Sequence, residues 1–280
     1  MPFATSASPL ASPGNLRARE QNTRGALLIT SAKGGKRKKA SSGGGGGKRS
    51  NDCTIVTVEQ DGSDLWRLAT VTEQLRQGAV GIIPTDTYPA LVCDVNAPTS
   101  SLETLYAAKD MSPRKPLSIL CRGFQDVTTY TLGFPAPSVA GQEDYFRLAR
   151  RILPGPYTFI LAASKQLPKQ VTDYDTGKAK SRKTVGVRLP DSEICQAILA
   201  DLDRPLLCSS AYAETEDTFD LPEAAVIADA YAGRGIDFIV DAGHQVAMGS
   251  TIIDMTSAEP VLIRQGKGAS EPFVHETVEV

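Results

Sequence analysis

Hydroxyl-bearing residues recur in this sequence at the places where its predicted strands end. They stand in four short runs: Pro84-Thr85-Asp86-Thr87, Gly155-Pro156-Tyr157-Thr158, Ser209-Ser210 and Ser250-Thr251. Loops at strand ends are where open sheets bind ligands, and hydroxyl and backbone N–H groups can bond phosphate oxygens. The four runs therefore predict a binding site for an anion.

Five basic residues accompany these runs, and together they would suit a triphosphate: Lys109, Arg114, Lys115, Arg188 and Arg264. Lysine and arginine neutralise phosphate charge, and arginine adds planar bidentate geometry. Each residue taken alone is better explained as a solvated surface charge or a turn residue. Only their joint placement at strand ends favours a binding role.

The histidines and cysteines favour neither a metal site nor a hydrolytic triad. Two histidines, His244 and His275, are too few for a three-histidine zinc site, and nothing marks His244 as the partner of a nucleophile. The five cysteines are widely spaced and odd in number, without a C-x-x-C pair, which indicates structural thiols in a reducing compartment. We therefore expect no metal bound by protein side chains.

Charge is distributed unevenly along the 280 residues, whose formal net charge is −2. Residues 1–50 hold ten of the 30 Lys and Arg residues and one of the 32 acidic residues, so the remainder carries about −11. This balance disfavours a protein coated with nucleic acid but permits a local basic groove. The 41% hydrophobic share suffices for a core, and no apolar run approaches the ~20 residues of a membrane helix.

The first fifty residues have the composition of a transit peptide, because they are basic, rich in Ala, Ser and Thr and almost free of acids. The absence of Arg before Arg17 favours import into a chloroplast over a mitochondrion. The alternatives are a low-complexity tail, as on a cytoplasmic protein, or a nuclear-targeting run around Lys36 to Lys39. We therefore divide the chain into a disordered basic leader, 1–50, and one folded domain, 51–280.

Helix and strand signals alternate after residue 52. Helices are predicted at 64–77, where Gly78 is the stop signal, at 100–109, where Ser100 and Glu103 have the form of a capping box, and at 145–153, 192–202 and 222–232. Strands are predicted at 79–83, 117–121, 157–161, 184–188, 206–209, 237–240, 251–254 and 261–264. The late strands follow one another without long helices between them. This order indicates a twisted mixed sheet in one α/β (α+β) domain.

Seven motifs in series resemble the YrdC/YciO family, in the family's own order, over about residues 64–273. They are Pro84-Thr85-Asp86-Thr87, the Lys109/Lys115-Pro116-Leu117 segment, Leu153-Pro154-Gly155-Pro156-Tyr157-Thr158, Val185-Gly186-Val187-Arg188-Leu189-Pro190, Ser209-Ser210-Ala211, Ser250-Thr251-Ile252-Ile253-Asp254 and Ile263-Arg264-Gln265-Gly266. The resemblance implies a twisted mixed sheet flanked by helices, with a concave basic cleft. It also implies, in active members, synthesis of threonylcarbamoyl-AMP from threonine, bicarbonate and ATP, a product used in tRNA threonylcarbamoyladenosine modification.

The resemblance assigns roles to nine residues. Lys109, Lys115 and Ser210 would be catalytic, and the substrate-binding residues would be Thr85, Thr87, Thr158, Arg188, Ser250 and Arg264. Attack of a threonine-derived carbamate on the α-phosphate of ATP requires positioning and charge stabilisation, with Mg²⁺ on the phosphates, and does not need a histidine base.

Three departures from the synthase pattern place the chain nearer the YciO branch. Met111 replaces the arginine of Lys-x-Arg-Pro, Tyr212 replaces the asparagine of Ser-x-Asn, and Pro89-Ala90 replaces a Tyr-Gly pair. Loss of a guanidinium and an amide typically lowers the rate on the order of two to four powers of ten. Two hypotheses follow: a synthase, or a relative that uses another small acceptor, and a non-catalytic protein that binds double-stranded RNA or tRNA.

Overall fold

The computed structural model describes residues 53–137, 143–172, 183–211, 224–243, 248–257, 259–271 and 273. The predicted leader, Tyr212 and both histidines lie outside these ranges. The described residues belong to one compact unit of the chain. None of their helices combines the length and the apolar character that crossing a membrane requires.

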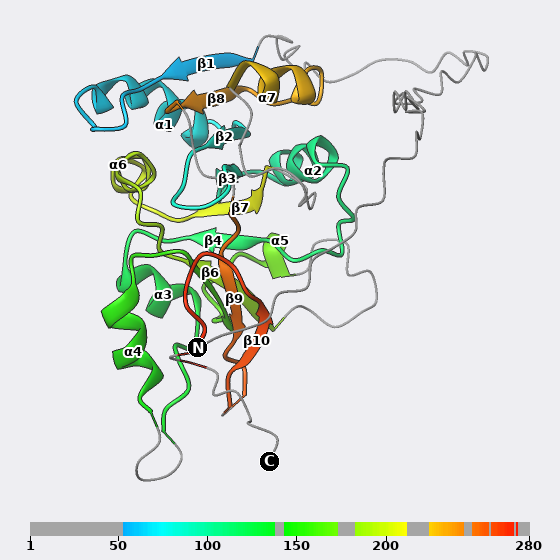
Figure 1. Cartoon of the computed structure of the whole chain (residues 1–280). Helices are drawn as coiled ribbons and strands as arrows, with labels where there is room; N and C mark the ends of the chain where they lie inside the picture. The colour runs from blue at the N-terminus through cyan, green and yellow to red at the C-terminus, as the bar shows by residue number, and fades with distance from the viewer. Residues whose placement is uncertain are drawn as a thin grey trace, which may run out of the picture. The chain divides into compact units, whose positions relative to one another are not determined.

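Ten strands of the described residues form a single sheet (Figure 1). They are β1 (Thr54–Thr57), β2 (Gly81–Ile83), β3 (Ala90–Asp94), β4 (Ser118–Leu120), β5 (Tyr157–Ala162), β6 (Thr184–Arg188), β7 (Leu206–Ser210), β8 (Phe238–Asp241), β9 (Thr251–Asp254) and β10 (Val261–Arg264). Their order across the sheet is β1-β8-β2-β3-β7-β4-β6-β5-β9-β10. Pairs β1–β8, β2–β8, β4–β6 and β5–β9 are parallel and the others are antiparallel, so the predicted mixed sheet is confirmed.

The helices of the described residues pack against this sheet through two hydrophobic clusters. They are η1 (Leu65–Leu68), α1 (Ala69–Arg76), α2 (Thr99–Ala108), α3 (Phe124–Tyr130), α4 (Tyr145–Ile152), α5 (Lys169–Thr172), α6 (Glu193–Leu202) and α7 (Ala224–Tyr231). Neighbouring strand residues alternate between the clusters: Ile82 lies in the one with α2, α3, α4 and α7, and Ile83 in the one with α1 and α6. This alternation is the two-residue period of a strand with both faces covered.

Two predicted helix signals have different outcomes. Gly78 ends the helix preceding β2 with a φ of +86°, a left-handed conformation that glycine adopts without strain. The capping box at Ser100 is wrong: α2 begins at Thr99 after Pro98, with no side-chain cap bond. Its neighbour Ser101 is fully buried and donates its hydroxyl to the carbonyl of Gly78 at 2.5 Å, so that serine ties the two helices together.

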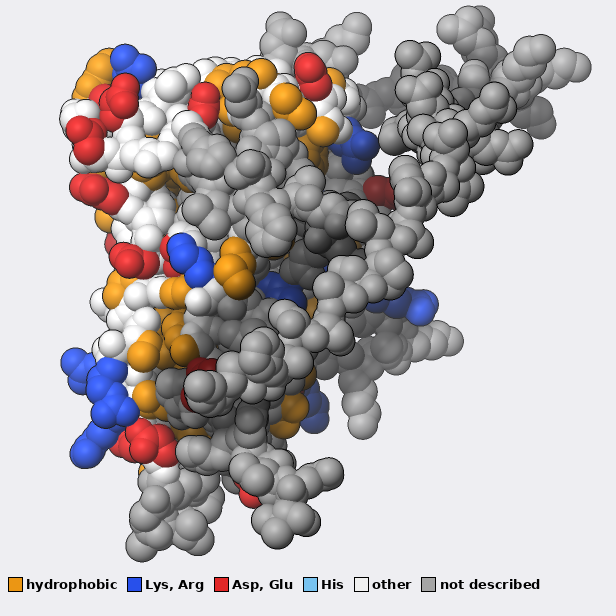
Figure 2. Space-filling view, in the orientation of Figure 1, with side chains coloured by type: hydrophobic (Ala, Val, Ile, Leu, Met, Phe, Trp, Pro, Cys, Tyr) orange, Lys and Arg blue, Asp and Glu red, His pale blue; other side chains and the backbone are white. Residues whose placement is uncertain are grey.

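Surface charge is segregated on the face shown in Figure 2. Acidic side chains stand along the edge that carries η1 and α1, whereas arginine side chains gather over α4. The arginines Arg147 and Arg151 are paired with Asp144 and Glu143, each at 3.2 Å. Exposed pairs of this kind contribute little to stability.

Candidate functional site

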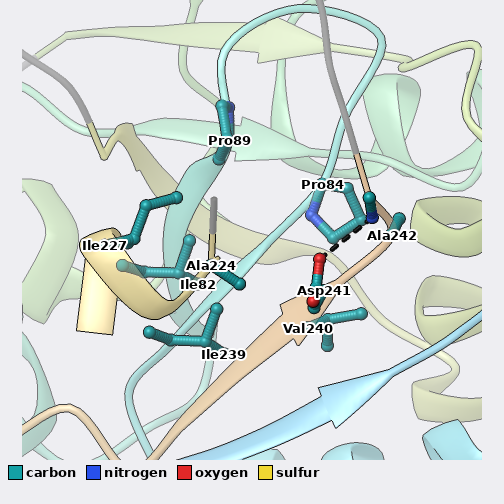
Figure 3. Close-up of a pocket in the computed structure, with 10 residues that line it drawn as sticks. Ile82, Pro84, Pro89, Ala224, Ile227, Ile239, Val240, Asp241 and Ala242 are labelled. Carbon is teal, nitrogen blue, oxygen red and sulfur yellow. Dashed lines mark hydrogen bonds between the residues drawn. The ribbon is translucent and has the colours of Figure 1, made fainter. Parts of the chain in front are cut away.

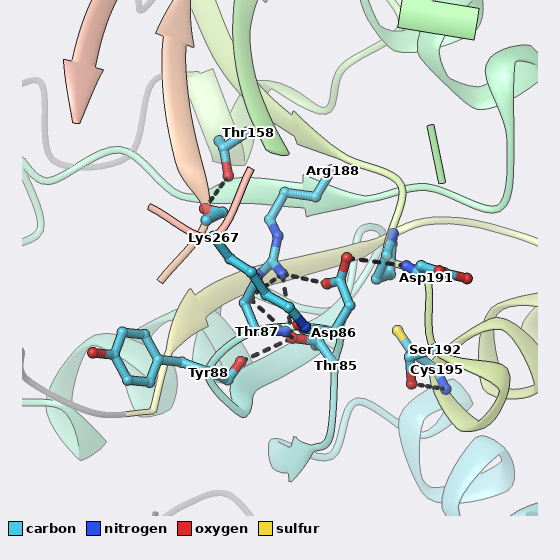
Figure 4. A network of polar contacts seen from close by, with 12 residues as sticks. Thr85, Asp86, Thr87, Tyr88, Thr158, Arg188, Asp191, Ser192, Cys195 and Lys267 are labelled. Carbon is cyan, nitrogen blue, oxygen red and sulfur yellow. Dashed lines mark hydrogen bonds and ion pairs between the residues drawn. The ribbon is translucent and has the colours of Figure 1, made fainter. Parts of the chain in front are cut away.

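A buried arginine connects two of the predicted motifs. Arg188 is the last residue of β6, and its Nη2 donates to Thr85 Oγ1 at 3.2 Å, to Asp86 Oδ1 at 3.1 Å and to Thr87 Oγ1 (Figure 4). Thr85 also donates its hydroxyl to the carbonyl of Tyr88 at 2.9 Å, which closes the loop after β2 on itself. Three residues that the sequence assigns to substrate binding are therefore brought together.

Asp86 is the counter-ion of that arginine. The side chains of Arg188 and Asp86 are 8% and 4% exposed, so the pair is almost wholly removed from water. The second oxygen of Asp86 accepts from the backbone N–H of Asp191 at 3.1 Å, and Arg188 Nε is buried without an acceptor among the described residues. A buried ion pair needs additional hydrogen bonds, such as the one from the Asp191 N–H, to offset its desolvation. The pair holds the Thr85–Thr87 loop against β6.

Lys109 and Ser210, both predicted to be catalytic, are in direct contact. Lys109 follows the last residue of α2, and its Nζ lies 3.0 Å from both Ser209 Oγ and Ser210 Oγ at the end of β7. Met111 Sδ lies 3.8 Å from Ser209 Oγ, and the half-buried Met111 side chain packs on the core. A thioether therefore lies beside Ser209, one of the two hydroxyls that contact the Lys109 ammonium, at the position where the family resemblance predicts an arginine.

The third predicted group joins β5, β9 and β10. Thr158 Oγ1 and Ser250 Oγ are 2.7 Å apart, and Arg264 Nη2 donates to the carbonyl of Ser250 at 2.9 Å. A Cβ at Gly249 would lie 2.8 Å from Arg264 Nη2 and 3.2 Å from Tyr88 Cε2, so a side chain there would displace the Arg264 guanidinium. The close approach at Gly249 brings Arg264 beside the residue that follows the Thr85–Thr87 loop.

Lys115 and Arg114 are not placed with these groups by any contact among the described residues. Both side chains are exposed on the turn between α2 and β4. The backbone of Lys115 is held in this turn: its carbonyl accepts from Tyr106 OH at 2.9 Å, and its N–H donates to the carbonyl of Ser112 at 2.9 Å. The predicted catalytic role of Lys115 therefore has no geometric support in these residues.

A polar pocket of about 300 Å³ opens beside the Thr85–Thr87 loop. Its lining includes Lys267, a residue outside the predicted site, whose Nζ donates to the carbonyl of Asp86 at 2.9 Å. The remaining charged lining residues are Asp86, Asp191 and Glu193, so the basic character predicted for the cleft does not extend to this pocket. The flanking glycines of Gly266-Lys267-Gly268 were the available signal for Lys267, because they permit close backbone approach.

A second pocket is small and apolar (Figure 3). Its volume is about 30 Å³, and Ile82, Ile227 and Ile239 are among the residues that enclose it, between β2, β8 and α7. Asp241, its charged lining residue, accepts from the backbone N–H of Gly243 at 2.9 Å. A space of about one water molecule does not admit a substrate.

The buried thiols are held in their neutral form. Burial raises the pKa of Cys208 from 9.0 to about 11, although Arg188 and Lys109 nearby oppose the rise. Burial also raises the pKa values of Cys93, Cys121 and Cys195. Because the thiolate is the reactive form, these cysteines are inert as nucleophiles at neutral pH. Among the residues that the structure describes, no three or more His, Cys, Asp or Glu side chains group as a metal site.

A mixed sheet with hydroxyls, lysine and arginine gathered at its strand ends defines an α/β protein with a polar, charged site at the ends of strands. The profile of the Sua5/YciO/YrdC family, described as telomere recombination, matches residues 73–266. The chain belongs to this family. All seven motifs named above from the sequence fall inside the matched range.

Similarity to individual family members covers most of the chain. The uncharacterized protein YciO of Escherichia coli is 31% identical over 203 residues, which is 72% of this chain and 90% of that protein. The crystal structure of E. coli YciO covers 80% of this chain and 100% of its own, at 27% identity and a TM-score of 0.66. Similarity to YciO agrees with the branch that Met111 and Tyr212 indicate.

A synthase is also among the relatives. The threonylcarbamoyl-AMP synthase of Pyrococcus abyssi is 28% identical over 218 residues, which is 76% of this chain and 58% of the synthase. The structure of P. abyssi Sua5 complexed with L-threonine matches 77% of this chain and 57% of its own, at 26% identity and a TM-score of 0.61. This chain thus spans somewhat more than half of that synthase.

Proposed function

We propose that this protein binds ATP with Mg²⁺ and joins AMP to the carbamate of an amino acid, as an enzyme of the threonylcarbamoyl-AMP synthase type. The observation that carries the proposal is the Lys109 ammonium, 3.0 Å from the hydroxyls of Ser209 and Ser210. A cation fixed between two hydroxyls is suited to the oxygens of a transferring phosphoryl group. The relatives named threonylcarbamoyl-AMP synthase support the reaction type.

The reaction has two steps. The amino group of the amino acid and bicarbonate form a carbamate and water. A carbamate oxygen then attacks the α-phosphorus of ATP, forming a C–O–P bond while the bond to the bridging oxygen breaks and pyrophosphate leaves with its electron pair. Negative charge gathers on the phosphoryl oxygens in the transition state, so the protein contributes mainly positioning and charge stabilisation.

The described residues could divide this work among three groups. Lys109 would neutralise phosphate oxygens, with Ser210 as a hydroxyl donor beside it. Thr158 and Ser250 would supply two further hydroxyls, and Arg264 a second cation held on the carbonyl of Ser250. Arg188 is 7% exposed and bonded to Thr85, Asp86 and Thr87, so its part is to fix the loop that faces the substrates.

The proposal is tested by calorimetric titration of MgATP into the full chain, with and without threonine and bicarbonate, together with a pyrophosphate-release assay. Lys109→Met should weaken ATP binding at least tenfold, because a half-buried charge-assisted contact is lost. Lys165→Met removes an exposed lysine that belongs to none of the motifs and should leave ATP affinity unchanged. Absence of ATP binding by the unmodified chain would contradict the proposal and make RNA the next ligand to test.

A further inference from the structure

The pocket beside Asp86 carries both signs of charge on its walls. Asp86 is neutralised by its buried pair with Arg188 at 3.1 Å, so it adds no net charge. The other charged lining groups are the Lys267 ammonium and the carboxylates of Asp191 and Glu193. Figure 4 shows Asp86 between Lys267 and Asp191. The pocket thus has a formal balance of −1.

Backbone hydrogen bonds and a close backbone contact fix the position of Lys267 beside the pocket. Its own N–H donates to the carbonyl of Gly249 at 2.9 Å, and the N–H of Gly266 donates to Thr251 Oγ1 at 2.9 Å. A Cβ on Gly266 would lie 2.4 Å from the carbonyl oxygen of Gly249, so only glycine permits this crossing. One of the three N–H donors of the ammonium serves the carbonyl of Asp86, which leaves two for a ligand.

Asp191 and Glu193 stand at the start of α6 and form no ion pair with any described cation. The backbone N–H of Asp191 is fixed on Asp86 Oδ2 at 3.1 Å. The carboxylate of Glu193 lies against Gly62, where a Cβ would meet its Oε1 at 2.7 Å. Both exposed carboxylates therefore line the pocket without forming an ion pair with its lysine, Lys267.

We propose that this pocket binds a cationic amino acid of the lysine and ornithine class. The ligand's carboxylate contacts Lys267, and its side-chain ammonium contacts Asp191 and Glu193, which leaves the α-amino group to form the carbamate. A volume of about 300 Å³ holds a molecule of this size. That this amino acid is the acceptor of AMP rests on the proposed function.

The test compares ligands that differ in one charge. L-Lysine, L-norleucine and L-threonine are titrated calorimetrically into the full chain at low salt. L-Norleucine has the carbon chain of lysine without its side-chain ammonium, so it should bind about two- to fivefold more weakly, the range of an exposed ion pair. The preference should shrink as salt is raised. Equal binding of lysine and norleucine, tighter binding of threonine, or no binding of any amino acid would overturn the inference.

Variants locate the preference in this pocket. Glu193→Gln and Asp191→Asn should each reduce the ratio of lysine to norleucine affinity, and Glu193→Lys should favour norleucine. Glu103→Gln, on an exposed position of α2, is the matched control and should keep the ratio. MgATP is titrated separately. ATP binding without a lysine preference overturns this inference alone, whereas a lysine preference without ATP binding supports the pocket and overturns the proposed function.

Discussion

Removing the charge of Arg188 tests whether its pair with Asp86 anchors the site. The perturbation is Arg188→Met, which keeps an unbranched apolar stem of similar reach. It deletes the donor to Thr85, Asp86 and Thr87 together and leaves the Asp86 carboxylate, 4% exposed, without its cation.

The expected loss of stability in Arg188→Met comes from the Asp86 carboxylate that stays buried, and not from the lost attraction between the two charges. Breaking a buried ion pair on one side typically costs about 3–5 kcal/mol, because the remaining charge stays desolvated. The bond from the Asp191 N–H to Asp86 remains, so we expect about 3 kcal/mol, the lower end of that range. The double variant Arg188→Met with Asp86→Asn removes both charges. Because effects of contacting residues are not additive, it should be about 1–2 kcal/mol more stable than Arg188→Met alone.

Urea unfolding of the four combinations at neutral pH gives the free energies of unfolding. The matched control is Arg147→Met, because Arg147 also pairs with an aspartate, Asp144, at 3.2 Å but with its side chain 83% exposed. That exposed pair should contribute at most about 1 kcal/mol. If Arg188→Met costs no more than Arg147→Met, or if the double variant is less stable than Arg188→Met alone, the buried pair does not anchor the loop.

Three further predictions concern packing, pH and helix capping. Gly186→Ala should lower stability by about 1–3 kcal/mol, because its Cβ would lie 2.3 Å from Ser118 Oγ; urea unfolding checks this, and Ser118→Ala in the same chain should recover part of the loss. The native state holds the Cys208 proton more tightly than the unfolded chain, so the free energy of unfolding should fall by roughly 3 kcal/mol as pH rises from 9 through 11. In Cys208→Ala this fall should be absent. The free energies of unfolding of both proteins are measured with urea from pH 8 to 11, and the same decrease with pH in both would contradict the prediction. Asp144→Ala should cost about 1 kcal/mol in thermal or urea unfolding, because the Asp144 carboxylate accepts from the N–H groups of Phe146 and Arg147 at the start of α4.

Strands with clear apolar character and polar borders could be predicted from the sequence. β6, β9 and β10 were predicted with their observed bounds, and the helix at 192–202 matches α6, where Ser192 Oγ accepts from the N–H of Cys195. β3 was missed because all five of its residues are buried, which removes the alternation that marks a strand. α3 was missed because seven residues give too short a helical period to distinguish from a loop.

The site could be predicted only as far as its residue types reveal it. Hydroxyls and cations at strand ends led to the contacts of Arg188 with Thr85 and Thr87 and of Lys109 with Ser210. The contact of Lys267 with Asp86 joins residues 181 positions apart, and a pattern of neighbouring residues cannot predict so distant a contact. From its sequence context Asp86 is expected to be a turn residue, and only its burial beside Arg188 shows that it is the counter-ion of that arginine. Import of the leader into a chloroplast and binding of RNA stay predictions.

The position of β8 in the sheet bears on how the chain is made. β8 lies between β1 and β2 and pairs in parallel with both, so the first two strands share a partner that begins at Phe238. At ribosomal speeds of about 5–20 residues per second, roughly 10–40 s separate the emergence of β1 from that of β8. During that interval Ile82 and its neighbours on β2 have an open edge toward the missing strand. The nascent chain should therefore depend on a chaperone, or on slow synthesis, more than the finished protein's single sheet suggests.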